Sequence, residues 1–212
     1  MSMSEVTRDA DLEPDGPPEF VPHYRHRWTW IETGLSSLFG LVAAVVLSMD
    51  ALAIAANPDV VFSCDISAKI SCGAVGRSWQ ATLLGDLPNA YLGMIAEPVI
   101  ITVAVASLAG VVFARWFMIA AHVVSGLGFV FAWWLFEQAA TQIHILCPWC
   151  LAVTVTTTLI FVAFTRINIL DGRFGKRAQR RLGPLIRYYH VDWIFNVVVV
   201  ALLASYVILN YL

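Results

Sequence analysis

The chain has 212 residues, of which 59% are hydrophobic and 13% are charged, whereas an ordinary soluble domain carries about 25% charged residues. This composition, with a mean hydropathy of +0.73, excludes a soluble enzyme and indicates a membrane protein. The formal net charge of −2 argues against nucleic-acid binding, because the basic residues occur in particular loops and not over a general surface.

Residues 1–29 form a polar, acidic segment that we predict to be a cytoplasmic tail. This segment lacks the basic head of a secretory signal, and the apolar window that follows is too long for a signal core. No small-residue cleavage site follows it either, so we expect no segment to be removed.

Five apolar windows follow the tail, and each is long enough to cross about 30 Å of hydrocarbon as a helix. The windows cover residues 31–56, 90–113, 116–136, 145–165 and 193–212. The connecting segments are too short to build a second domain with its own core. The sequence therefore predicts an all-α membrane protein in which residues 30–212 form a single module of five transmembrane helices.

The Lys and Arg residues predict which loops face the cytoplasm. With the N-terminus inside, eleven of the thirteen lie on the cytoplasmic side, seven of them in loop 166–192, as the positive-inside rule prefers. We interpret that basic loop as a topology signal next to anionic headgroups and not as a nucleic-acid or regulatory lipid site. The C-terminus is then expected outside, together with segment 57–89.

The predicted topology brings all four cysteines to the extracytoplasmic side. Cys64 and Cys72 lie in segment 57–89, whereas Cys147 and Cys150 lie at the outer mouth of the fourth span. An even number of cysteines on an oxidising side suggests disulfides. The C-x-x-C pattern at a helix start is typical of reversible redox chemistry.

The residue between the two cysteines of this motif supports that interpretation. Pro148 suits the first turn of a helix, so Cys147 is expected close to the N-cap, where free amides and the helix dipole favour its thiolate. A zinc site is a less favoured alternative because the spacing of Cys64 and Cys72 is unusual for zinc, and no metal is expected. Permanent structural disulfides are the other alternative.

These motifs, together with the stretch Leu87-Pro88-Asn89-Ala90-Tyr91-Leu92-Gly93, resemble those of bacterial homologues of vitamin K epoxide reductase. The resemblance extends from about Trp28 to Thr165. It implies a four-helix bundle around a quinone plus one additional helix, located in the bacterial inner membrane. Bacterial members are similar to DsbB in task, since they oxidise a thioredoxin-fold, DsbA-like partner and pass the electrons to a quinone, menaquinone or ubiquinone. The chain stops at Leu212 without a fused thioredoxin-like domain, so we expect a separate partner protein.

The resemblance also implies a role for each matching residue. Cys150 would face the quinone with Cys147 as its partner, while Cys72 would exchange with Cys147 and Cys64 would meet the partner protein. Asn89 matches an asparagine that donates a hydrogen bond to a quinone carbonyl, where negative charge develops during reduction.

One position departs from the vertebrate members of the family. Thr154 stands one helical turn after Cys150, where the vertebrate enzymes carry a tyrosine. Inhibitor and epoxide behaviour is therefore not transferred to this chain.

Several alternatives stay open from the sequence. The chain could work as a reductase in the opposite direction or on a quinone epoxide, or as a scaffold with structural disulfides. Glu97 could relay protons or make a buried structural hydrogen bond, and His144 could stabilise the Cys147 thiolate or be an interfacial residue. Segment Ala74–Leu84 has the spacing of a short amphipathic helix that either seals the bundle or anchors at the interface.

Overall fold

A computed structural model describes residues 26–83, 85 and 87–211, so most of the predicted acidic tail lies outside the described residues. Within these ranges the structure is helical and contains no strand. Five helices are long and apolar enough to cross a membrane. They are α1 (Arg27–Ala56), α3 (Ala90–Leu108), α4 (Arg115–Gln138), α5 (Pro148–Leu170) and α7 (Val191–Tyr211). The predicted all-α class with five spans is confirmed.

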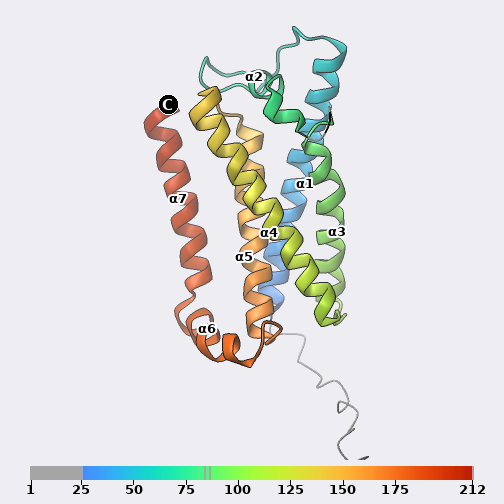
Figure 1. The fold of residues 1–212 in the computed structure, drawn as a ribbon, viewed down its shortest axis with the longest axis vertical. Coiled ribbons are helices and arrows are strands. Elements are labelled where there is room, and N and C mark those ends of the chain that lie inside the picture. The colour runs from blue at the N-terminus through green and yellow to red at the C-terminus, as the bar shows by residue number, and fades with distance from the viewer. Residues whose placement is uncertain (1–25, 84, 86, 212) are drawn as a thin grey trace, which may run out of the picture.

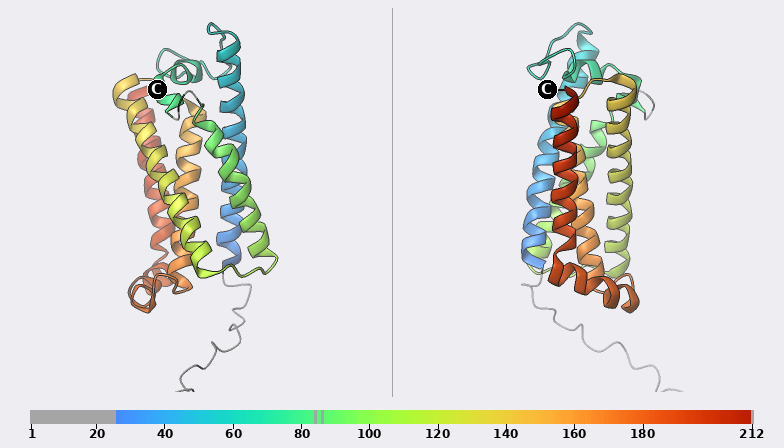
Figure 2. Two further views of the ribbon diagram at one scale, coloured as in Figure 1. Left: turned by 45° about the vertical axis from the view of Figure 1, so that its right-hand side comes forward. Right: turned by 90° about the vertical axis from the view of Figure 1, so that its left-hand side faces the viewer.

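Helix α5 occupies the centre of the bundle (Figures 1 and 2). It packs against α1, α4 and α7, while α3 packs against α1. A core cluster that includes Trp30, Met118 and Phe164 joins α1, α4 and α5. The rings of Trp30 and Phe164 meet edge to face with centroids 6.1 Å apart, a favourable aromatic geometry.

Helices α1 and α3 approach each other closely because small residues lie at their contact. A Cβ added to Gly93 would lie 2.8 Å from the Cβ of Ala44, and one added to Gly40 would lie 2.7 Å from Oε1 of Glu97. Small residues allow such close backbone approach in membrane bundles. Glu97, at 4% exposure, is thus packed between helices and does not face lipid.

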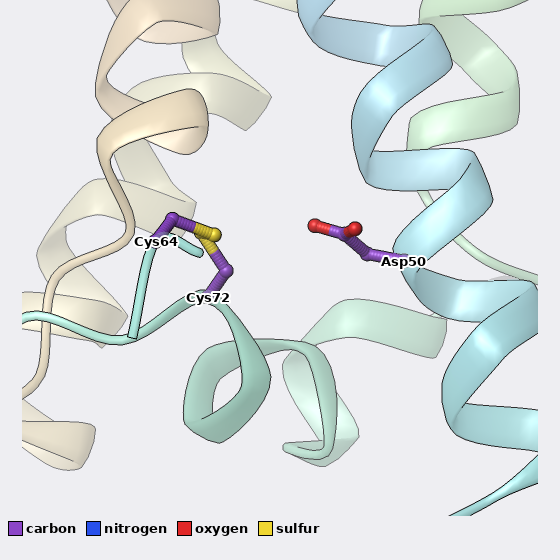
Figure 3. Close-up of side chains that lie close together, drawn as sticks. All are labelled: Asp50, Cys64 and Cys72. Atoms are coloured by element: carbon purple, nitrogen blue, oxygen red, sulfur yellow. A yellow bond between two sulfur atoms is a disulfide. The ribbon is translucent and has the colours of Figure 1, made fainter. Parts of the chain in front are cut away.

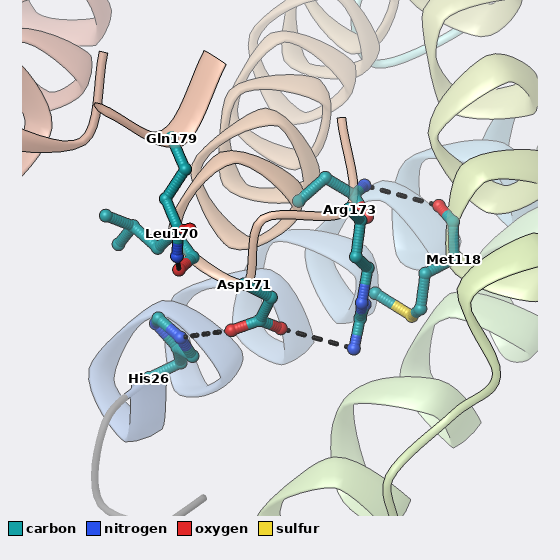
Figure 4. Close-up of polar contacts among 7 residues, drawn as sticks. His26, Met118, Leu170, Asp171, Arg173 and Gln179 are labelled. Atoms are coloured by element: carbon teal, nitrogen blue, oxygen red, sulfur yellow. Dashed lines mark hydrogen bonds and ion pairs between the residues drawn. The ribbon is translucent and has the colours of Figure 1, made fainter. Parts of the chain in front are cut away.

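The end of the bundle opposite the cysteines carries a further helix that sequence reasoning missed. Segment 166–192 was expected to be a loop, but α5 continues to Leu170 and α6 (Lys176–Tyr189) lies across the base of the bundle (Figure 1). Asp171 accepts from His26 at 2.9 Å and pairs with Arg173 at 3.2 Å, while the Gln179 amide donates to the Leu170 carbonyl at 2.7 Å (Figure 4). These contacts hold the turn between α5 and α6 against the start of α1.

Two further boundaries differ from the sequence prediction. The second span ends at Leu108 and not at 113, because Gly110 adopts φ +102° and the Val111 amide bonds back to the Ala106 carbonyl at 2.9 Å. This is the Schellman ending of a helix. In place of one amphipathic helix over Ala74–Leu84, the structure has two short helices, α2 (Cys72–Gly76) and the 3₁₀ helix η2 (Trp79–Thr82).

The two ends of the bundle carry different elements of the chain. The end of α7 lies at the same end as α2 and the start of α5, whereas α6 and the start of α1 lie at the opposite end (Figures 1 and 2). A π-helical turn, η3 (Ala139–Ile143), extends α4 toward the α2 end before the chain turns into α5. All four cysteines therefore gather at the α2 end, away from the basic α6.

Candidate redox site

Two backbone hydrogen bonds join the α2 loop to the segment that precedes α5. The Ser71 amide donates to the Leu146 carbonyl and the Leu146 amide donates to the Lys69 carbonyl, each at 3.0 Å. Ser71 and Leu146 each immediately precede a cysteine. As a result, Sγ of Cys147 lies 3.6 Å from Sγ of Cys72, and both residues are buried, with 1% and 3% of their surface exposed.

The two loop cysteines, Cys64 and Cys72, form a disulfide, with their Cα atoms 5.6 Å apart. Asp65 holds this part of the loop by accepting from the amides of Phe62 at 2.8 Å and Gly73 at 2.9 Å, and from the Ser71 hydroxyl at 2.6 Å. The Ser71 oxygen in turn accepts from the Ala74 amide at 3.0 Å and caps α2. The loop geometry around the disulfide thus depends on a single carboxylate.

The charge of Asp65 is stabilised by these donors. Burial raises the pKa of Asp65, but the hydrogen bonds from Phe62, Ser71 and Gly73, with the nearby Arg77 guanidinium, outweigh it and hold the pKa below the usual range. Asp65 therefore remains a carboxylate, and a threefold acceptor, under all but acidic conditions.

The C-x-x-C motif has the helix-start geometry that the sequence predicted. Cys147 is the N-cap of α5, Pro148 is in its first turn, and the Cys150 amide donates to Sγ of Cys147 at 3.4 Å. The Cys150 thiol, followed by the amides of Cys150 and Trp149, lowers the pKa of Cys147 despite burial and the negative charge of Asp50. Cys147 and Cys150 are free thiols in the structure, so Cys147 is a favoured thiolate next to a closed disulfide.

Asp50, near the C-terminal end of α1, points toward the Cys64–Cys72 disulfide (Figure 3). One of its carboxylate oxygens and the two sulfur atoms lie within 4.8 Å of one another. Two sulfur atoms joined in a disulfide do not offer the thiolates that bind metal ions. The position of the Asp50 carboxylate therefore relates this residue to the chemistry of the cysteines and not to metal binding.

Asn89, which directly precedes α3, ties that helix to η2. Its amide nitrogen donates to the Gln80 carbonyl at 2.6 Å, and its oxygen accepts from the Leu83 amide at 3.2 Å. The donation to a quinone carbonyl that the resemblance implies would use the second hydrogen of the Asn89 amide nitrogen. Asn89 thus has a structural role at the cap of the bundle in addition to the role that the resemblance implies.

A pocket of about 510 Å³ lies between α1 and α5 and begins at the C-x-x-C motif. Its lining residues come from both helices and are Leu35, Ser36, Phe39, Pro148, Leu151, Ala152, Val155, Thr156 and Leu159. The volume and the apolar walls fit a quinone ring and the start of its tail. Cys150 is adjacent in sequence to Leu151, although neither Cys150 nor Asn89 is among the described lining residues.

The structure separates the other candidates from the cysteines to different degrees. Thr154, 3% exposed, donates to the Cys150 carbonyl at 3.0 Å and so lies directly under the motif. His144 is exposed, and its ring nitrogen lies 3.3 Å from the Gln142 carbonyl. Glu97 lies near Gly40 and Thr156, one of the pocket residues, deep between α1, α3 and α5.

The sequence did not reveal the residues that shape the site but lie outside the cysteine motifs. Asp65 was not singled out, although an Asp directly after a cysteine in a short polar loop is a common acceptor of backbone amides. From the sequence alone, Asp50 can be interpreted as a residue at the boundary of the first span. Neither the contact between the loop and Leu146 nor the direction of the Asp50 side chain has a signal in a single sequence.

The fold and the site define a multi-pass helical membrane protein with two pairs of redox-capable cysteines at one end of its bundle. Residues 32–165 match the vitamin K epoxide reductase family, and the chain belongs to this family. No curated protein matches the chain. Family membership makes the chain a membrane thiol oxidoreductase, and proteins of the family use quinone. Helices α6 and α7 lie outside the matched residues.

Proposed function

We propose that this protein oxidises a separate thioredoxin-fold, DsbA-like partner and passes two electrons to a membrane quinone, menaquinone or ubiquinone, in support of disulfide formation in exported proteins. The observation that carries the proposal is the 3.6 Å contact between Sγ of Cys147 and Sγ of Cys72. A free thiol of a C-x-x-C motif that touches a closed disulfide is the arrangement that thiol–disulfide exchange requires.

The chemistry proceeds between the two cysteine pairs. A partner dithiol reduces the Cys64–Cys72 disulfide, and the Cys72 thiolate then attacks Cys147 in an oxidised Cys147–Cys150 pair. Cys64 next attacks Cys72, which restores the loop disulfide and leaves Cys147 and Cys150 as thiols. Two electrons and two protons have then moved from the partner to the C-x-x-C pair.

A bound quinone supplies the final acceptor for two electrons and two protons. The residues suited to hold its apolar body are Leu35 and Phe39 of α1 and Leu151 and Val155 of α5, which line the pocket beside the motif. The apolar walls disfavour water beside the bound ring, which protects the reactive thiols from side reactions. Asn89 would donate its second amide hydrogen to a quinone carbonyl.

The loop cysteines differ in their access to a partner protein. Cys72 is 3% exposed, whereas Cys64 as a whole residue is only partly buried, although its sulfur is buried as well. This difference favours Cys64 as the residue that meets the partner and Cys72 as the one that exchanges internally. The basic α6 at the opposite end supports a cytoplasmic N-terminus and an extracytoplasmic cysteine site. The location that we propose is a bacterial inner membrane.

The test is quinone reduction by the purified full-length protein, with reduced dithiothreitol as the dithiol and a short-chain ubiquinone or naphthoquinone as the acceptor. We expect dithiol-dependent quinone reduction by the wild type above the uncatalysed background, and none by Cys147→Ser. Gln142→Ala, a neighbouring exposed change that leaves all cysteines intact, is the matched control and should retain activity. Equal rates for the wild type and Cys147→Ser would overturn the proposal.

A further inference from the structure

Asp50 carries a carboxylate that the cysteine relay described above does not use. Its oxygen Oδ2 is buried and has no hydrogen-bond partner among the described residues. An unpaired buried carboxylate costs free energy, so such a group in a membrane protein usually has a function. Its side chain points at the disulfide, with one oxygen and both sulfur atoms within 4.8 Å of one another (Figure 3).

The described cations near Asp50 bond to other groups, which leaves its carboxylate free to accept a proton. Arg77, at the end of α2, donates to the backbone carbonyls of Pro58 at 2.7 Å and Val60 at 2.5 Å. From the loop, Asp65 faces Asp50 with a like charge. Lys69 is directed elsewhere, since its amino group donates to the Asn210 carbonyl at 2.9 Å.

From α5, the groups that face Asp50 are the two thiols of the C-x-x-C motif. The charge of Asp50 acts on both Cys147 and Cys150. Hydrogen bonds to Cys147 lower the pKa of its thiol. The ionised Asp50 carboxylate has a smaller, opposite effect, because its negative charge disfavours the Cys147 thiolate. Protonation of Asp50 would remove this opposing charge, so the protonation of the carboxyl and the negative charge on sulfur are coupled.

We propose that Asp50 is the proton-transfer residue of the cysteine relay: its carboxylate takes the proton of the attacking loop thiol and returns it to the cysteine that leaves at α5. This inference rests on the proposed function, because it concerns exchange between the two cysteine pairs. One water molecule, or rotation of the thiols once the disulfide is open, bridges the remaining distance.

The steps balance without an external acid or base. The Cys72 S–H bond breaks, its proton goes to Asp50, and the Cys72–Cys147 bond forms as the Cys147–Cys150 bond breaks with its electron pair on Cys150. Cys150 then takes the proton from Asp50. In the second exchange Cys64 gives its proton to Asp50 and attacks Cys72, and the departing Cys147 takes that proton. The loop pair is oxidised by two electrons, and the C-x-x-C pair is reduced by two.

A single-turnover experiment isolates this step. Fully reduced full-length protein, free of added dithiol, is mixed with excess short-chain quinone. Oxidation of Cys147 and Cys150 gives a first equivalent of reduced quinone. The loop pair gives a second equivalent only after internal exchange. The oxidation state of each pair is read in parallel by thiol alkylation and peptide mass.

For Asp50→Asn we expect a second phase slowed by about 10²-fold at neutral pH, the lower range for general acid–base catalysis, with the first phase not slowed. The deficit should shrink at alkaline pH, where the loop thiols lose their protons without help. Asp50→Glu should restore the second phase, and Asp59→Asn, an exposed change in the same outer segment, should resemble the wild type.

Different outcomes of this experiment would overturn the proposed function and the role of Asp50. The absence of both phases in the wild type would overturn the proposed function. A normal first phase together with an unchanged second phase in Asp50→Asn, or an equal loss at every pH that Asp50→Glu does not restore, would overturn the role of Asp50. The first phase also reports folding. If Asp50→Asn lacks it, the pair Asp50→Glu and Asp50→Gln, matched in size and different in charge, gives the same comparison.

Discussion

The peptide hydrogen bond from Ser71 to Leu146, 3.0 Å long, determines how the two cysteine pairs of this protein meet. Each of these residues directly precedes a cysteine, so a contact in the backbone is converted into a contact between sulfur atoms. The loop that carries one pair is thereby aligned with the helix start that carries the other. The positions of Cys72 and Cys147 are set by main-chain geometry and do not depend on a flexible side chain.

The first prediction tests this alignment. In Cys64→Ala/Cys150→Ala, the remaining Cys72 and Cys147 have sulfur atoms 3.6 Å apart and should form a disulfide within one chain under mild oxidation. The matched control, Cys72→Ala/Cys147→Ala, retains the other two cysteines and should crosslink much more slowly. Non-reducing peptide mass analysis measures both. Equal crosslinking in the two variants would contradict the geometry.

The second prediction concerns Asn89. If its amide stabilises negative charge on a quinone oxygen, Asn89→Ala should reduce quinone turnover by about 10²–10³-fold, the usual cost of one such donor. Asn89→Asp keeps the acceptor for the Leu83 amide but lacks the amide donor, so its turnover should fall as well. Cys150→Ala, in contrast, removes a redox thiol and should abolish turnover. Unchanged turnover in Asn89→Ala would remove this residue from the quinone site.

The sequence predicted the parts of the fold that depend on local pattern. Apolar length revealed the five spans, and Pro148 after a cysteine placed the start of α5, because proline is preferred in the first helical turn. Helix α6 was missed because its basic residues were assigned to topology, although apolar residues such as Leu182 and Ile186 recur between the Arg residues at helical spacing. The hydrogen bonds of Asp65 and Asn89 depend on contacts across the loop that no local pattern encodes.

The third prediction concerns Asp65 and acid. The pKa of Asp65 in the folded loop lies below its ordinary value, so its stabilisation of the loop is fully present above the ordinary aspartate pKa of about 4. The stabilisation should be lost as the pH falls through the folded-state pKa. Limited proteolysis with pepsin, an acid-active protease, should cleave loop 57–71 increasingly as the pH is lowered below about 4.

Asp65→Asn provides the comparison for this pH dependence. An amide cannot accept from three donors as a carboxylate does, so the loop should already be cleaved readily at the upper end of the pH range. Cleavage of Asp65→Asn should therefore increase less than cleavage of the wild type as the pH is lowered. A cleavage profile identical to that of the wild type would show that Asp65 does not hold the loop.

The fourth prediction concerns the contact between α1 and α3. In Gly93→Ala the new Cβ would lie 2.8 Å from the Cβ of Ala44, a buried methyl group. The helices must separate slightly, which should cost about 1–3 kcal/mol, as overpacking usually does. Gly128→Ala meets no atom within 4 Å and should leave stability unchanged or raise it, since alanine favours a helix. Thermal unfolding in detergent compares the two, and equal midpoints would contradict the close approach.

The last prediction tests the order of the relay at the loop pair. Exchange proceeds through a mixed disulfide, and removal of the resolving thiol leaves that intermediate stranded. In Cys72→Ala, the Cys64 thiol should therefore displace thionitrobenzoate from a purified DsbA-like protein whose single active-site cysteine carries that group, and should accumulate as a mixed disulfide with it. In Cys64→Ala, Cys72 should be captured far less by the same activated protein, because it is 3% exposed. In Cys147→Ala the loop disulfide should still react transiently with the reduced form of the DsbA-like protein, yet Cys150 should receive no electrons. Non-reducing electrophoresis and peptide mass identify the captured cysteine. Capture through Cys72 in Cys64→Ala, with none through Cys64 in Cys72→Ala, would reverse the roles of the two loop cysteines while leaving the enzyme class intact.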